Sequence, residues 1–92
     1  MKMTLDEALN ILHIDAGEND ETILVLLDVI ASYIEVTTGL AIEHQANEPL
    51  VYGVTKLLLT LMYYGDYVKD YDVLQRAIDM LLKAISARVD RH

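Results

Sequence analysis

The side chains best suited to chemistry lie in an acidic segment near the start of the 92-residue chain. Its carboxylate and amide oxygens are ligands that Ca²⁺ prefers, and they belong to Asp15, Glu18, Asn19, Asp20 and Glu21. A helix–loop–helix calcium site requires acids at alternate positions, a glycine at the sixth position and a glutamate at the twelfth. This segment lacks that order. We therefore expect a solvated loop that caps the next helix, and no metal site.

Histidines and serines are too scattered to form a catalytic or metal-binding motif. His13, His44 and His92 lack partners at the spacing of a zinc or di-iron motif, so they are expected at the surface. Ser32 and Ser86 fall within predicted helices, away from the sharp turn or adjacent base that a nucleophilic serine needs. We expect no catalytic residue and no cofactor, so the chain is not predicted to be an enzyme.

Four of the six tyrosines gather in one short stretch: Tyr63, Tyr64, Tyr67 and Tyr71. Tyrosine has an apolar ring and a polar tip, which suits both a protein–protein interface and the end of a core. Both interpretations of this cluster stay open. The other two, Tyr33 and Tyr52, are expected to be ordinary packing residues.

Hydrophobic periodicity predicts that helices carry these residues. A capping box formed by Thr4 and Glu7 should start a short helix over residues 5–12. A long helix should follow from Asn19 or Asp20 and end at a glycine, Gly39, which readily adopts the left-handed conformation of a helix end. The residues that follow, up to the next helix, are expected to be a connector.

Two further helices are predicted in the second half of the chain. Pro49 suits the first turn of a third helix, which Gly65 should end. Apolar residues surround nearly all of this third helix, so it is expected to be the most buried. Asp72 should cap a fourth helix, with Gln75 completing a second capping box. No stretch alternates at period two, so we expect a single all-α, four-helix domain over residues 1–92.

Composition and charge indicate a small protein that hides part of its surface against partners. The hydrophobic share is 53%, above the roughly 45–50% that is typical of globular chains. Neither a cysteine nor a secretory signal nor an apolar run of about 20 residues is visible, so a soluble, intracellular protein with no membrane span is expected.

The net charge of −8 is unevenly distributed along the chain. Residues 1–50 carry ten carboxylates against one lysine, giving −9, and residues 51–92 carry five carboxylates against six basic residues, giving +1. The two halves could attract each other across copies of the molecule, or the excess could serve only solubility. Favourable pairs of Asp72 with Arg76 and of Asp79 with Lys83 are expected on the outer face of the fourth helix. The overall sign disfavours binding to nucleic-acid phosphates.

Several short motifs occur in a recognisable order: Leu12-His13-Ile14-Asp15, Asn19-Asp20-Glu21, Tyr33-Ile34-Glu35, Thr38-Gly39, the helix from Pro49 to Tyr64, and Ile78-Asp79-Met80-Leu81-Leu82. In this order the chain resembles the head–tail connector (adaptor or head-completion, "DNA packaging") proteins of long-tailed bacteriophages. Two features differ from that family. Gly65-Asp66 stands where a basic residue is frequent, and no proline precedes the last segment.

The resemblance implies a structural virion protein that forms a ring of about a dozen copies beneath the portal protein, closed by a head-to-tail contact. Such a ring seals the filled head, offers a surface to the next connector or tail-completion protein, and lets DNA pass through its lumen without specific binding. The expected location is the virion, and the bacterial host cytoplasm during assembly.

The residues that we expect to make contacts combine exposed acids of the second helix, the connector and the tyrosine cluster: Asp28, Glu35, Glu43, Tyr64, Tyr67 and Tyr71. Two alternatives remain open. One is a helical adaptor in a host regulatory complex with no viral role. The other is an enzyme subunit that holds substrate in the groove beside the third helix.

Overall fold

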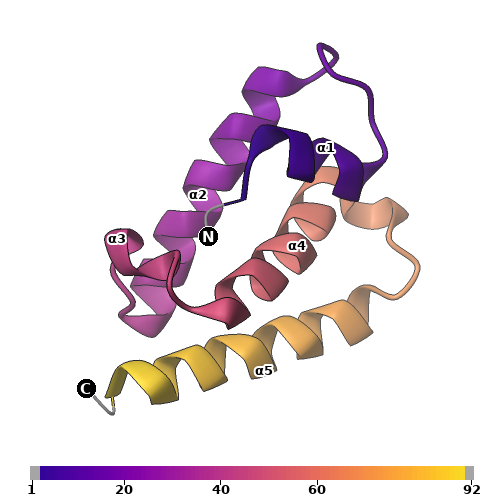
Figure 1. Ribbon diagram of the computed structural model, residues 1–92. Coiled ribbons are helices and arrows are strands. Elements are labelled where there is room, and N and C mark those ends of the chain that lie inside the picture. Colours follow the sequence, from indigo (N-terminus) through magenta and orange to yellow (C-terminus); the bar gives the residue numbers. More distant parts are fainter. Residues whose placement is uncertain (1–2, 91–92) are drawn as a thin grey trace.

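The computed structural model describes residues 3–90, which form helices joined by short loops (Figure 1). The helices are α1 (Leu5–Leu12), α2 (Asp20–Thr38), α3 (Ile42–Gln45), α4 (Pro49–Tyr64), the 3₁₀ turn η1 (Gly65–Tyr67) and α5 (Tyr71–Asp90). No strand occurs within this range, so the all-α prediction is confirmed.

The first helix starts with the predicted capping box. The Thr4 hydroxyl accepts a hydrogen bond from the Glu7 N–H at 3.2 Å, and the Glu7 carboxylate accepts one from the Thr4 N–H at 3.0 Å. These bonds satisfy two backbone groups that a helix start leaves unpaired. The helix ends at His13, whose φ of 59° places it in the left-handed region. The predicted bounds of α1 are therefore confirmed, while the left-handed cap at His13 was not predicted.

The Glu7 carboxylate also links α1 to α4, because the Tyr52 hydroxyl donates to it at 2.8 Å. The hydrogen bond from the Thr4 N–H, followed by the one from Tyr52, lowers the pKa of Glu7 below its usual 4.5. The same contact with Glu7 raises the pKa of Tyr52. The folded state thus stabilises the ionised form of Glu7.

Glu7 should make stability depend on pH in the acid range. Because its pKa is lower in the folded state, its contribution is present above about pH 4.5 and is lost as the pH falls through the folded pKa. Glu7→Gln keeps a capping side chain but cannot titrate. We expect the melting temperature, followed by circular dichroism, to fall more steeply below about pH 4.5 in the wild type than in Glu7→Gln. Parallel pH profiles would contradict this assignment.

The second helix provides a long face of the core. Ile23, Leu27, Ile30 and Ile34 are buried at the spacing of one helical face. The cap position is held by Asn19, but its amide makes no capping bond and donates instead to the Tyr63 hydroxyl at 2.7 Å.

The end of α2 follows the prediction. Gly39 has a φ of 82°, and its N–H donates to the Glu35 carbonyl at 2.9 Å. A left-handed residue at this point satisfies a helix carbonyl and turns the chain away.

The fourth helix lies between α2 and α5, and α1 also packs against it (Figure 1). It starts at Pro49 and ends before Gly65, as predicted. Five of its residues are buried, the same number as in α2, while Tyr52 and Met62 are exposed. The prediction that this helix is the most buried is therefore not confirmed.

The connector differs from the expectation because it contains a further helix, α3, so the described residues hold five α-helices rather than four. The Glu35 carboxylate accepts a hydrogen bond from the first N–H of this turn, that of Ile42, at 3.0 Å. The buried Gln45 amide donates to the Ala31 carbonyl of α2 at 2.8 Å. These bonds come from a distant part of the chain, so hydrophobic periodicity in four residues could not reveal them.

The last helix starts at Tyr71, two residues before the start at Val73 that a cap at Asp72 implies. Asp72 therefore lies inside the first turn and is not the cap, and the Gln75 amide points forward to Asp79, at 3.4 Å, rather than back to the helix start. The predicted pairs of Asp72 with Arg76 and of Asp79 with Lys83 do not form. Within residues 3–90 the one ion pair joins Arg88 to Glu48.

Candidate functional site

The three acids predicted as contact residues lie on α2 and α3. Asp28 and Glu43 are exposed, while Glu35 is half-buried and holds the start of α3. Asp28 lies one α-helical heptad before Glu35, so both carboxylates lie along the same edge of α2. The structure thus places two of the three at a surface where another molecule can reach them.

An apolar stripe runs beside these acids along the outward face of α2, opposite its buried face. Val25, Val29, Tyr33 and Val36 follow each other at steps of four, four and three residues, which is one face of a helix, and all four are exposed. Val36 is 83% exposed. We call these four residues the α2 stripe. The prediction that Tyr33 is an ordinary packing residue is wrong.

The outward face of α5 carries a second stripe. Val73, Met80 and Ala87 repeat every seven residues and are exposed, with Met80 72% exposed. We call these three residues the α5 stripe. Two exposed basic residues, Arg76 and Lys83, run along one edge of it. Neither stripe was recognised from the sequence, although the seven-residue interval on α5 is a signal that could have revealed it.

The tyrosine cluster divides into two parts. Tyr63 and Tyr64 pack edge to face, with ring centres 5.0 Å apart, and the Tyr64 hydroxyl donates to the Leu12 carbonyl at the end of α1. These two close one end of the core. Tyr67 is 91% exposed, and Tyr71 is also exposed, so both are accessible to a partner.

Tyr52, predicted to be an ordinary packing residue, is also exposed. Its hydroxyl is used in the bond to Glu7 described above. An amphipathic side chain can thus lie at the surface while its tip is held by a neighbouring helix.

The Tyr64 hydroxyl should matter for stability, because without it the Leu12 carbonyl loses this partner. We expect Tyr64→Phe to lower the free energy of unfolding by about 1–2 kcal/mol. Tyr67→Phe is the matched control: it removes the same atom from an exposed ring, and its effect should stay within about 0.5 kcal/mol. Urea unfolding followed by circular dichroism measures both. Equal losses in the two variants would contradict this role.

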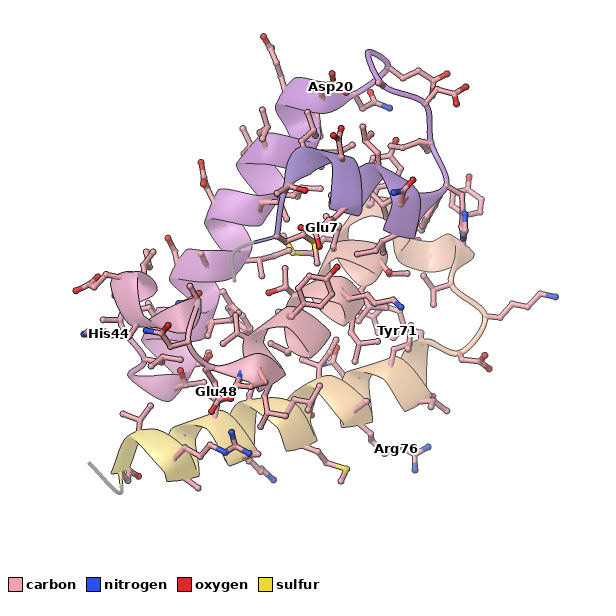
Figure 2. The ribbon with its side chains drawn as sticks, in the orientation of Figure 1. Glu7, Asp20, His44, Glu48, Tyr71 and Arg76 are labelled. Atoms are coloured by element: carbon pink, nitrogen blue, oxygen red, sulfur yellow. The ribbon has the colours of Figure 1, made fainter. Side chains whose placement is uncertain are left out.

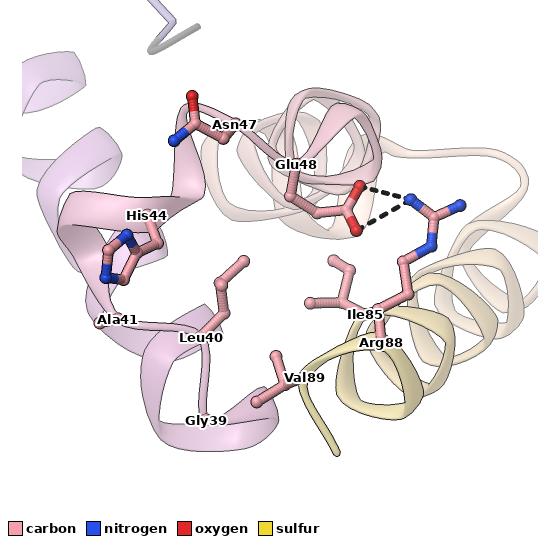
Figure 3. Close-up of a pocket in the computed structure, with 9 residues that line it drawn as sticks. All are labelled: Gly39, Leu40, Ala41, His44, Asn47, Glu48, Ile85, Arg88 and Val89. Carbon is pink, nitrogen blue, oxygen red and sulfur yellow. Dashed lines mark hydrogen bonds and ion pairs between the residues drawn. The ribbon is translucent and has the colours of Figure 1, made fainter. Parts of the chain in front are cut away.

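A pocket of about 470 Å³ lies where the end of α2, α3 and the last turns of α5 meet (Figure 3). Arg88 and Glu48 face each other on one side of it, with Arg88 Nη1 2.9 Å from both carboxylate oxygens, while His44 and Asn47 lie on other sides. The two charged groups therefore neutralise each other. This pocket differs from the groove beside the third predicted helix that the enzyme alternative required.

The acids and histidines considered for chemistry do not gather at one place: Asp20 and His44, for example, lie far apart (Figure 2). His13 and His44 are exposed, and His92 lies outside the described residues. Among residues 3–90, no group of three or more acids or histidines is placed to hold a metal ion. In the same range, none of the helices combines the length and apolarity that a bilayer crossing requires.

Comparison with protein-family models, with curated proteins and with solved structures finds no match to this chain. Its function is therefore inferred from its own residues, their geometry and the order of its motifs.

Proposed function

We propose that this chain is a structural subunit of a phage head–tail connector, which forms a ring between portal and tail. The ring closes the DNA-filled head and lets DNA pass through its lumen without specific binding. Its partners are further copies of the chain, the portal protein and the next connector or tail-completion protein. It acts in the virion, assembles in the bacterial host cytoplasm, and works by packing rather than by catalysis.

The observation that carries the proposal is the outward face of α2, where solvent-exposed apolar side chains lie beside acids. Val25 and Val36 are among the most exposed apolar residues of the helix. Contiguous apolar patches on soluble proteins commonly mark surfaces that other molecules cover. A subunit completed by its neighbours in a ring needs such a face. The order of motifs that resembles the connector family supports the same role.

In this proposal the four longer helices, α1, α2, α4 and α5, are the frame of the subunit, and α3 fastens the connector segment to α2. The side chains of α4 that are exposed in the single chain, Tyr52 and Met62, are covered in the assembly. The helix then becomes the most enclosed of the frame.

Light scattering of the chain alone and with its cognate portal protein tests the proposal. We expect the mixture to contain a species heavier than the portal assembly alone. A variant with Val29→Lys and Val36→Lys should fold, because both positions are exposed, but should fail to join that species. Absence of association under both conditions would contradict the connector function.

A helical adaptor outside any virus would use the same exposed face of α2, so the chain alone does not separate the two functions. The gene neighbourhood does. Genes for portal, capsid and tail proteins beside this gene favour the connector, and an isolated gene favours the adaptor.

A further inference from the structure

The outward faces of α2 and α5 are complementary in charge. The α2 stripe is bordered by acids: Glu21, Asp28 and Glu35. The α5 stripe is bordered by bases: Arg76 and Lys83. We propose that α2 of one copy packs antiparallel against α5 of the next copy through these two faces. The inference rests on the proposed function, for which it supplies the contact between neighbouring subunits.

The charged residues of the two helices have opposite signs and the same spacing. Asp28 and Glu35 are seven residues apart, and so are Arg76 and Lys83. At about 1.5 Å per residue, each pair spans roughly 10.5 Å along its helix, so both carboxylates meet both bases in one register. The helices themselves, of 19 and 20 residues, are about 28 and 30 Å long, which allows contact along their whole length.

The charged groups of both faces are available to a partner. Neither Arg76 nor Lys83 takes part in an ion pair within the described part of the chain, where Arg88 and Glu48 form the one pair. Asp28 is exposed. One oxygen of Glu35 accepts the Ile42 N–H, and this bond orients the carboxylate while its second oxygen stays open to a base.

The position of the charges around each helix determines the direction of packing. Successive residues are rotated by about 100° around the axis of a helix. Measured in that direction of rotation, Asp28 lies just before the α2 stripe, and Arg76 and Lys83 lie just before the α5 stripe. Two facing helices bring such edges to the same side only when they run antiparallel. Asp28 then lies beside Lys83, and Glu35 lies beside Arg76. Two acids of α5, Asp72 and Asp79, lie one step further around the helix, away from the stripe. A third, Asp90, continues the row of Arg76 and Lys83 at the very end of α5, so the matched charges are those of Asp28 and Glu35 and not that of Glu21.

The same charges disfavour pairing of identical faces. A two-fold contact between two α2 helices would place acids against acids, and one between two α5 helices would place bases against bases. Since the α2 stripe and the α5 stripe are both exposed in the single chain, one copy can offer both outward faces at the same time. A contact between unlike faces repeats from copy to copy, which generates rings or filaments.

Cysteine pairs test the contact and its direction, because the wild-type chain contains no cysteine. A Val36→Cys copy mixed with a Val73→Cys copy should form a disulfide-linked dimer under mild oxidation, since antiparallel packing brings the end of α2 to the start of α5. A Val25→Cys copy with the same Val73→Cys partner should yield at least about tenfold less, because a disulfide needs Cα atoms within about 7 Å. All three valines are exposed, so the variants should fold.

Each of three other outcomes of this crosslinking experiment would overturn the proposal. A dominant Val25–Val73 product would mean parallel packing. Dominant homodimers of Val36→Cys would mean pairing of two α2 helices. Yields no higher than those of a Glu18→Cys copy with Val73→Cys, in which Glu18 lies outside the α2 stripe, would mean that the two faces do not meet.

Charge reversal gives a second, independent test by sedimentation of the full chain. One variant carries Asp28→Lys and Glu35→Lys, and the other carries Arg76→Glu and Lys83→Glu. Each alone should associate about tenfold to a hundredfold more weakly than the wild type, because like charges meet. The two variants mixed should regain association, because each again offers unlike faces to the other. Association of either variant alone at the wild-type level would overturn the proposal.

Failure of this contact can be told apart from failure of the proposed function. If the reversed variants still join the cognate portal as the wild type does, the α2–α5 contact is wrong while the connector role stands. If the copies crosslink as expected but never join the portal, the contact stands and the connector role is wrong.

Discussion

Leu59→Ala is expected to lower the free energy of unfolding by about 2–5 kcal/mol, because it deletes a fully buried side chain and leaves a cavity. Leu59 lies in α4, the helix against which α1, α2 and α5 all pack. A helix at the centre of so small a domain has few other elements that could close around the lost volume. Since domains are stable by only about 5–15 kcal/mol, this loss is a large fraction of the total stability.

Met62→Ala is the matched control for that prediction. Met62 lies three residues further along the same helix and is 42% exposed. Its loss should cost less than about 1 kcal/mol, because a side chain at the surface leaves no closed cavity when it is shortened. Urea unfolding followed by circular dichroism gives both values. If the two variants lost the same stability, the position assigned to α4 in the core would be wrong.

Gly39→Val is expected to cost about 2 kcal/mol or more. Gly39 has a φ of 82°, a conformation that β-branched side chains adopt only under strain. The residue ends α2 and turns the chain toward α3 and the pocket between α2 and α5. Its Cβ would lie 3.7 Å from a methyl group of Val89, an ordinary contact, so the backbone conformation rather than lack of space is the obstacle.

Gly39→Asn separates those two causes. Asparagine adds a Cβ at the same place but tolerates the left-handed region, so its cost should stay below about 1 kcal/mol. Thermal melts of both variants provide the measurement. Equal destabilisation by asparagine and valine would show that the contact with Val89, and not the helix end, controls this position.

The features that the sequence predicted correctly are those that depend on neighbouring residues. Thr4 and Glu7 pair three residues apart, Pro49 needs no donor at a helix start, and Gly39 turns left-handed at a helix end. Each of these signals acts over one turn of helix, so the bounds of α1 and α4 could be read directly.

The features that were missed depend on distant residues. The turn of α3 is held by Gln45 bonding to Ala31, fourteen positions away. The Tyr64 hydroxyl finds its acceptor, the Leu12 carbonyl, on another helix. No local pattern distinguishes Tyr64, which closes the core, from the exposed Tyr67 three residues later.

The candidate site was predicted only in part. The acids Asp28 and Glu35 were expected at a contact surface. In the structure Asp28 is exposed and Glu35 is half-buried. The apolar stripe beside them was missed because α2 is apolar on two faces, and hydropathy alone does not show which face meets the core. The burial of Ile30 and the exposure of Val29 show which face meets the core, and this information comes only from the packing of the fold.

The number of copies bound to the portal tests the central claim most directly. Native mass spectrometry of the complex, purified through a tag on the cognate portal protein, counts them. The connector function predicts a closed ring, hence many copies in one fixed number, about a dozen by the family resemblance. Portal assemblies that carry no copy of this chain, or only a single copy, would contradict it.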